Sequence, residues 1–278
     1  MKNTNNWILN GVNVKLNMDF QKVNGIIDLK FELKNTTMMK KLSILIMMAA
    51  FPLFVEAQTA AEVVDKFLNA AGGENKISTI NTFQYKRAYK ANAATDYDEE
   101  VTIVSGENKF SRKKSILDRD FYYVLNGNAG WLKIPMGSRD KAPTYTTKDL
   151  NDKEKADLML EVKDGLMPFY NYESKGYRLV GAIEDVTIDG KATSKLTIEK
   201  TGIKREYYFD KANGLLLREI WIVNGITHTL DHKKYEDTKL GVKLPVESSY
   251  LNSKDKKINA VTTEWILENP TQGVSFIK

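Results

Sequence analysis

Two histidines and a run of carboxylates are the residues best suited to chemistry. His228 and His232 have the same parity on a predicted strand, so their side chains face the same way. Strand residues four apart are separated by about 13 Å at the backbone, which is too far for easy coordination of one metal ion. The run Asp98-Glu99-Glu100 is typical of a solvated strand or loop rather than of a catalytic acid pair. We therefore predict no metal site and no catalytic residue.

The chain also lacks the motifs that mark common enzymes. It has no G-x-S-x-G element for a serine nucleophile and no glycine-rich phosphate or dinucleotide loop. It has no cysteine, so thiolate nucleophiles, disulfides, zinc-thiolate sites and a lipid-anchoring cysteine are excluded. We expect a protein that is not an enzyme and needs no cofactor, with an exported hydrolase as the least favoured alternative.

Aromatic residues and methionines suggest a different kind of site. Trp131, Trp221 and Trp265 lie on predicted strands, and a predicted helical stretch runs from Lys148 to Asp164, followed by apolar residues up to Tyr170. These side chains either pack a core or line a cavity in which the helix acts as a lid. Methionine adapts to irregular apolar ligands, which suits an acyl-chain carrier. The candidate lid residues are Met159, Leu160, Leu166, Met167 and Phe169.

A segment typical of an export signal lies between residues 38 and 57. Lys40 and Lys41 precede an apolar run from Leu42 to Val55, and small residues precede a cleavage position before Gln58. Fourteen apolar residues are too few to cross a bilayer core, which needs about 20 in a helix. We predict a signal peptide at 38–57 and a periplasmic protein without a lipid anchor.

The signal divides the chain into unequal parts. Residues 1–37 are predicted to be a mis-called start or a disordered extension, the alternative being a genuine extension with a strand at Gly25–Leu33. Residues 58–278 are predicted to form a single domain. Residues 1–57 carry seven lysines and four acids, so the formal charge of +5 falls to +2 without them. A formal charge this close to zero gives no support for nucleic-acid binding.

The elements of residues 58–278 begin with a helix and continue mainly as strands. Thr59 and Glu62 form a capping box, and Gly72-Gly73 ends the helix. Strands follow from Thr82, with a hairpin signal at Asn126-Gly127-Asn128, and after the helical stretch only strands and short turns remain. Strands joined by short turns are antiparallel, and a sheet of about ten strands must curl, split or close. The predicted fold class is mainly β (α+β), with a large curled antiparallel sheet or incomplete β-barrel, an N-terminal helix and a helical lid.

Short motifs carry a family resemblance. They are Ala70-Ala71-Gly72-Gly73-Glu74, Asn108-Lys109-Phe110, Gly130-Trp131 with Pro135, Tyr208-Phe209-Asp210 with Gly214-Leu215, and Glu268-Asn269-Pro270. With these motifs the chain resembles the LolA/LolB lipoprotein carrier superfamily, and more closely the "outer membrane lipoprotein-sorting protein" group of Bacteroidota. The resemblance implies an incomplete antiparallel barrel that holds acyl chains on its concave face. The carriers have an arginine just ahead of the Asn-x-Phe turn that helps to tie down the lid. In this chain Ser105-Gly106-Glu107 occupies that region, and Arg112 is the candidate to replace the arginine.

The function expected from pattern and resemblance is a periplasmic carrier in outer-membrane lipoprotein sorting. Its partners would be lipoprotein acyl chains or another lipid, together with inner- and outer-membrane envelope proteins, and it would be a monomer that binds no nucleic acid. The alternative is an envelope-assembly or structural protein that uses the same fold, with a filled interior, to bind proteins. The predicted ligand-binding residues are Trp131, Met159, Leu160, Leu166, Met167, Phe169, Trp221 and Trp265.

Overall fold

The fold was analysed from a computed structural model. It describes residues 2–9, 12–23, 26–29, 58–91, 95–223, 225–254 and 256–278, and the backbone alone in the first three ranges. The chain divides into two compact units, residues 1–56 and 57–278. The predicted signal peptide at 38–57 lies outside the described residues, and the description of the second unit begins at Gln58.

The first unit contains a small antiparallel sheet. Its strands are β1 (Lys2–Leu9), β2 (Val12–Val23) and β3 (Ile26–Leu29), in that spatial order. Strand β3 lies within the stretch Gly25–Leu33, which the sequence marks as a candidate strand.

The second unit is built on one large antiparallel sheet of 14 strands. Its strands are β4 (Thr82–Ala91), β5 (Tyr97–Val104), β6 (Lys109–Ile116), β7 (Arg119–Asn126), β8 (Ala129–Met136), β9 (Thr144–Asp149), β10 (Arg178–Leu179), β11 (Glu184–Ile188), β12 (Lys191–Lys200), β13 (Ile203–Asp210), β14 (Leu216–Val223), β15 (Ile226–Asp237), β16 (Lys243–Asn252) and β17 (Ile258–Ile266).

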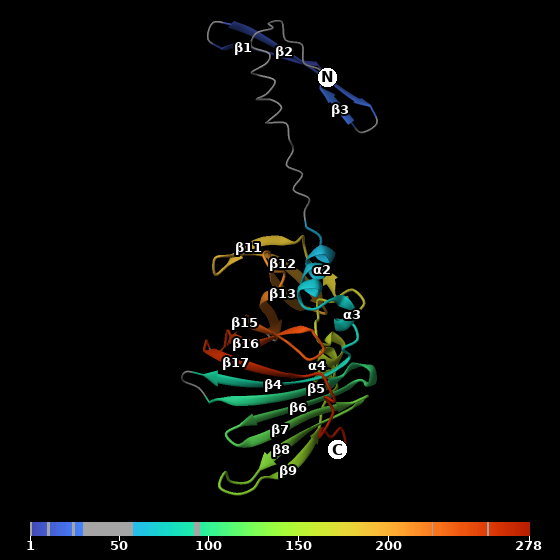
Figure 1. Ribbon diagram of the computed structural model, residues 1–278, viewed down its shortest axis with the longest axis vertical. Coiled ribbons are helices and arrows are strands. Elements are labelled where there is room, and N and C mark those ends of the chain that lie inside the picture. The colour runs from blue at the N-terminus through green and yellow to red at the C-terminus, as the bar shows by residue number, and fades with distance from the viewer. Residues whose placement is uncertain are drawn as a thin grey trace. The chain divides into compact units, whose positions relative to one another are not determined.

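The sheet consists of two meanders that meet at one seam (Figure 1). Strands β4 to β9 pair in sequence order, and strands β12 to β17 do the same. The seam is the pairing of β17 with β4, where Val261 lies opposite Tyr89. Strand β9 ends the sheet on one side, while β10 and β11 both pair with β12 on the other. The sheet therefore stays open, which confirms the predicted incomplete barrel of antiparallel strands.

The first helix of this unit confirms the capping box expected from sequence. Helix α2 (Ala60–Ala70) is capped by Thr59, whose hydroxyl accepts from the Glu62 amide while the Glu62 carboxylate accepts from the Thr59 amide. Gly72 ends it at φ 115°, and a Cβ there would lie 2.3 Å from the carbonyl oxygen of Gly241. Only glycine allows this close approach between the helix end and the β15–β16 connection. The short helix α3 (Glu74–Ile77) follows.

The second long helix begins later than predicted. Helix α4 spans Asp152–Asp164 and is capped by Asn151, which forms a capping box with Glu154. The expected start at Lys148 is wrong, because residues 144–149 are strand β9, paired with β8. Local side-chain hydrogen bonds thus fix the start of the helix, and the residues before it belong to the sheet.

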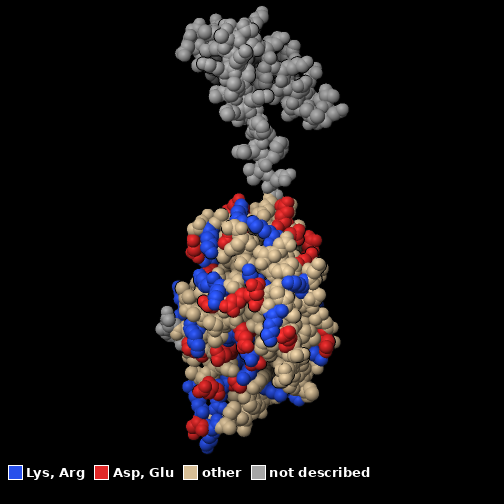
Figure 2. Space-filling model, in the orientation of Figure 1, with Lys and Arg blue, Asp and Glu red and all other residues tan. Residues whose placement is uncertain are grey.

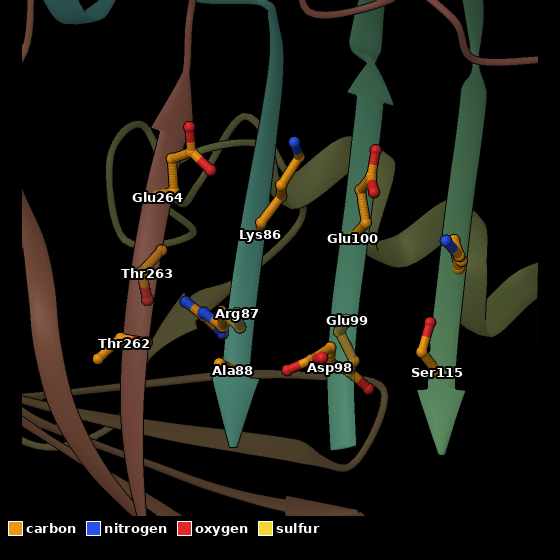
Figure 3. Close-up of a pocket in the computed structure, with 11 residues that line it drawn as sticks. Lys86, Arg87, Ala88, Asp98, Glu99, Glu100, Ser115, Thr262, Thr263 and Glu264 are labelled. Atoms are coloured by element: carbon orange, nitrogen blue, oxygen red, sulfur yellow. The ribbon is translucent and has the colours of Figure 1, made fainter. Parts of the chain in front are cut away.

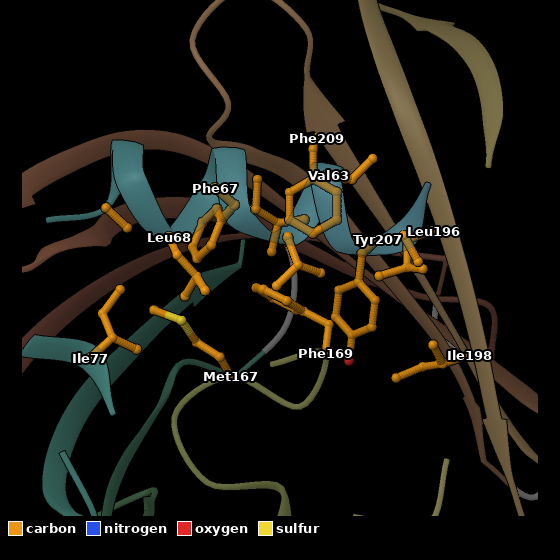
Figure 4. Close-up of a cluster of buried hydrophobic side chains, with 14 of the residues drawn as sticks. Val63, Phe67, Leu68, Ile77, Met167, Phe169, Leu196, Ile198, Tyr207 and Phe209 are labelled. Atoms are coloured by element: carbon orange, nitrogen blue, oxygen red, sulfur yellow. The ribbon is translucent and has the colours of Figure 1, made fainter. Parts of the chain in front are cut away.

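Helices α2 and α4 define the two faces of the sheet. We call the face they pack against the inner face and the opposite one the outer face. At one end of the inner face, α2 packs with Leu196, Tyr207 and Leu216 in one apolar cluster (Figure 4). In a second cluster, α4 packs on a row that includes Phe83 and Phe110. Burial of these apolar surfaces stabilises the unit at about 25 cal/mol per Å².

The surface of this unit mixes charges of both signs. Figure 2 shows acidic and basic side chains interspersed over the face in view. Within the part of the chain that the structure describes, no helix has the length and apolar character needed to span a membrane.

Candidate functional site

The helix-covered end of the inner face is filled by the chain itself. Phe169 is only 2% exposed, and its ring centroid lies 5.0 Å from that of Phe67, 4.9 Å from that of Tyr207 and 5.1 Å from that of Phe209. Met167 is buried in the same cluster (Figure 4). These two predicted lid residues therefore act as core anchors of the segment that follows α4.

The other predicted lid residues lie at the border of this core. Met159 and Leu160 are half-buried on α4, and each packs against one of the two apolar clusters. Leu166 is half-buried and contacts both. The segment is thus a packed cover over one end of the sheet, and the remainder of the inner face extends beyond it.

The three predicted tryptophans do not lie together. Trp265 is on the inner face, where it pairs with Tyr85 and donates a 2.8 Å hydrogen bond from Nε1 to the carbonyl oxygen of Pro245. Trp221 is also on the inner face, two residues from Glu219, which pairs with Tyr207 of the core. The structure places Trp131 on the outer face, since its neighbour Leu132 is the residue that packs against the α4 cluster.

Beyond the helices, aromatic rings form a run across the inner face. Trp221 stacks on His228 with ring centroids 5.2 Å apart and an angle of 7° between planes. Tyr250 stacks on His228 at 6.0 Å and meets Tyr89 edge to face at 5.7 Å. Tyr89 stacks in turn on Tyr97 at 4.3 Å. We call these five residues the aromatic shelf; all except Tyr89 are half-buried, and none belongs to either apolar cluster of the described residues.

Cationic side chains lie between the shelf and the helices. The Arg87 guanidinium stands 4.5 Å from the centroid of the Tyr85 ring, and its buried Nε has no hydrogen-bond partner. Arg87 forms no ion pair with any carboxylate of the described residues. Arg112, the candidate for the carriers' arginine, reaches α4 with its Nη2 2.6 Å from Glu161 Oε2. The inner face therefore presents an arginine without an ion pair beside a row of aromatic rings.

An ion pair marks the edge of the helix-covered end. Arg205 Nη2 lies 2.7 Å from Oδ2 of Asp164, the last residue of α4, and both side chains are largely buried. The hydroxyl of Tyr177 donates to the same carboxylate at 2.9 Å. Nearby, Lys175 donates to the carbonyl oxygens of Asp164 and Met167, and burial lowers the pKa of its ammonium to about 8.

A carboxylate–histidine pair lies next to the shelf. Burial alone would raise the pKa of Glu219, but the hydrogen bond from His232 and the charges of Arg87 and Arg205 hold it below its usual value. The two groups are joined by a 2.9 Å contact between His232 Nε2 and Glu219 Oε1. His232 Nδ1 also contacts the hydroxyl of Ser248 at 3.1 Å, so both ring nitrogens have protein partners. Burial lowers the pKa of His228.

The sequence predicts Trp221 and Trp265 as site residues, but it does not predict most of the aromatic and charged side chains that lie near them. Tyr89 and Tyr97 lie opposite each other on β4 and β5, and the pairing of β17 with β4 brings Tyr250 of β16 beside them. Arg87 was missed because an arginine on a strand ordinarily faces solvent. Its parity with Phe83 and Tyr85 was the one available signal that it lies on the buried side.

The outer face carries two hollows of the described region. The first, of about 460 Å³, lies over β17, β4, β5 and β6, where Glu264, Lys86 and Glu100 stand opposite one another on adjacent strands (Figure 3). The second, of about 450 Å³, lies between β5–β9 and the C-terminal residues. Neither was expected from the sequence.

The chain is similar to several solved structures at low sequence identity. A putative outer membrane lipoprotein-sorting protein domain from Vibrio parahaemolyticus has a TM-score of 0.44 and 14% identity, over 76% of this chain and 94% of that chain. An uncharacterized conserved protein from Thermus thermophilus has a TM-score of 0.28 and 12% identity, over 80% and 96%. The MucA/MucB complex of Pseudomonas aeruginosa gives a TM-score of 0.23 and 11% identity, over 77% and 96%.

The first of these structures is a lipoprotein-sorting protein domain, the kind of protein that the sequence motifs resemble. No protein-family model matches the chain, and no curated protein matches it. At such low similarity the function has to be argued from the residues of this chain. Their arrangement offers half-buried aromatic surface beside a cation on one side of the sheet, and two hollows of mixed lining on the other.

Proposed function

We propose that this protein is an exported, periplasmic binding protein that is not an enzyme, and that it holds the acyl chain of a lipoprotein or another lipidic ligand on its inner face. The observation that carries the proposal is the aromatic shelf, a run of ring contacts that the helices leave half-buried. Covering the shelf with an acyl chain would stabilise the complex by about 0.8 kcal/mol per buried CH₂ group.

The charge beside the shelf favours an amphipathic ligand over a purely apolar one. Arg87 lies on the same face as the rings, and although its charge acts on Glu219, it forms no direct ion pair with a carboxylate of the described residues, so an acidic head group would give it one. An uncharged hydrocarbon would leave that guanidinium partly covered and unpaired, which costs free energy.

The test is a native mass spectrum of the protein purified from the periplasm without detergent. We expect extra mass that leaves on mild activation and proves to be lipid or acylated peptide. Trp221→Ser should reduce the loaded fraction about tenfold, because it removes the largest ring of the shelf. The matched control is Trp131→Phe on the outer face, which should leave loading unchanged.

A second candidate is a protein-binding role on the same face. It is favoured by the filled helix-covered end, where Met167 and Phe169 leave no space of their own for a ligand. A mass spectrum without added mass, in a protein that also ignores added diacyl lipid, would support this second candidate and contradict the first.

A further inference from the structure

The hollow under the C-terminal residues has the form of a binding site on the outer face. One wall is formed by residues 273–277, and the base is formed by side chains of β5 to β9. Asn126 Nδ2 donates to the carbonyl oxygen of Phe276 at 3.1 Å, and Lys278 forms an ion pair with Asp149. These contacts hold the end of the chain across the sheet, so that the hollow is bounded on two sides.

Its base is a row of three side chains on adjacent strands. Lys113 of β6 pairs with Tyr122 of β7, and Tyr122 pairs with Lys133 of β8, so the phenol ring lies between two lysine stems. The ring of Tyr145 meets Tyr122 edge to face at 5.8 Å. The hollow measures about 450 Å³, within the range of pockets that hold small molecules.

The two lysines differ in their ion pairs. Lys113 Nζ lies 3.3 Å from Oδ2 of Asp120. Lys133 forms no ion pair with any carboxylate in the described ranges, although it lines the hollow. Its ammonium is therefore the group in this hollow that lacks a counter-ion.

The remaining lining is mixed in character. Val124, Val274 and Ile277 supply apolar contact, while Ser111 and Thr147 supply hydroxyl groups. Glu100 adds a carboxylate on β5, three strands away from Lys133, and its Oε1 accepts a 3.1 Å hydrogen bond from Gln84. Ile277 is 78% exposed, an unusual position for an isoleucine at the rim of a hollow. A ligand that covered it would gain from removing this side chain from water.

We propose that this hollow binds a small organic anion whose acidic group pairs with Lys133 and whose aromatic or aliphatic body lies on Tyr122 and Val124, beneath residues 273–277. The acidic group is a carboxylate, sulfonate or phosphate, all of which accept hydrogen bonds from an ammonium. The site lies on the opposite face from the aromatic shelf, and it is independent of the function proposed above.

Titration of the full chain with anilinonaphthalene sulfonate, an aromatic anion whose fluorescence rises in apolar surroundings, tests the proposal. We expect saturable binding that includes one outer-face site, which Lys133→Met weakens about tenfold and Lys133→Arg retains, while any probe bound at the aromatic shelf stays bound in these variants. Ending the chain after Gly273 should weaken binding by a similar factor, since it removes one wall. In methyl NMR spectra, Ile277 should shift as the probe is added.

Two control variants locate the site. Glu264→Gln removes a charged group that lines the other outer-face hollow alone, and it should leave the titration unchanged. Trp221→Ser alters the aromatic shelf and should leave the Lys133-dependent part of the binding unchanged. Absence of probe binding, binding that ignores both Lys133→Met and the truncation, or loss of the Lys133-dependent part in Trp221→Ser would each overturn the proposal.

Discussion

At the helix-covered end of the inner face, aromatic rings meet edge to face and are almost wholly buried, as Phe67 and Phe169 do at 5.0 Å and 87°. At the shelf, the rings of Trp221 and His228 stack at 5.2 Å and 7° and stay half-buried. Both ends use aromatic residues on the same sheet face. The difference lies in what covers them, since the first end is closed by α2 and the segment after α4, whereas no helix of the described residues covers the second. Aromatic content alone therefore does not separate a core from a binding surface.

The largest effect that separates the two ends should come from Phe169→Ala. We expect it to lower the free energy of unfolding by about 3–5 kcal/mol, because the lost ring leaves a cavity among three other rings. Urea titration followed by circular dichroism measures this. The matched shelf variant, Trp221→Ser, should lower it by less than half as much, and equal losses would mean that the shelf is part of the core.

A smaller effect is expected at the boundary between the ends. Arg205→Met should lower the free energy of unfolding by about 3 kcal/mol, because it leaves the Asp164 carboxylate buried without its ion pair. The double variant Asp164→Leu with Arg205→Met should recover much of this loss, since it removes both charges. If the double variant is as unstable as the single one, packing rather than the charge pair holds the end of α4.

The smallest effect is a pH dependence of the shelf itself. Burial lowers the pKa of His228 below 6.5, so below about pH 6.5 the unfolded chain takes up this proton more readily than the folded one. The contribution of neutral His228 to the free energy of unfolding is therefore complete above that pH and is lost as the pH falls toward the folded-state pKa. Comparing unfolding of the wild type and His228→Gln at about pH 7.5 and about pH 5.5 isolates this contribution. If the difference in unfolding free energy between wild type and variant is the same at both pH values, then folding does not lower the pKa of His228.

The parts of the fold that the sequence predicts are those governed by local chemistry. The capping box of Thr59 with Glu62 and the hairpin at Asn126-Gly127-Asn128 depend on residues within a few positions of one another, and both are present. The start of α4 had the same kind of signal in Asn151 and Glu154. It was missed because Leu150, a residue buried in the α4 cluster, fits the apolar pattern of a helix and of a strand end equally well.

The site was harder to predict because it depends on strand parity and distant pairing. Trp131 and Leu132 are adjacent and both apolar, so only the register of β7 with β8 decides which one faces the helices. The run Asp98-Glu99-Glu100 likewise divides between the faces. In the register of β4 with β5, Glu99 lies opposite Arg87 on the inner face, and Glu100 lies opposite Lys86 on the outer face. The outer-face hollows depend on where the C-terminal residues lie, for which the sequence holds no periodic signal.

The seam between β17 and β4 has a consequence for how the chain folds. Most strands pair with the strand next to them in sequence, so each meander can form through short loops at low entropic cost. The seam instead joins residues 82–91 to residues 258–266, across nearly the whole unit. Because Tyr89 and Tyr250 meet only across it, the complete aromatic run cannot assemble until this long-range contact has formed. The proposed binding surface would then be acquired in the slowest step of folding, so a nascent or partly folded chain could not load the proposed ligand early.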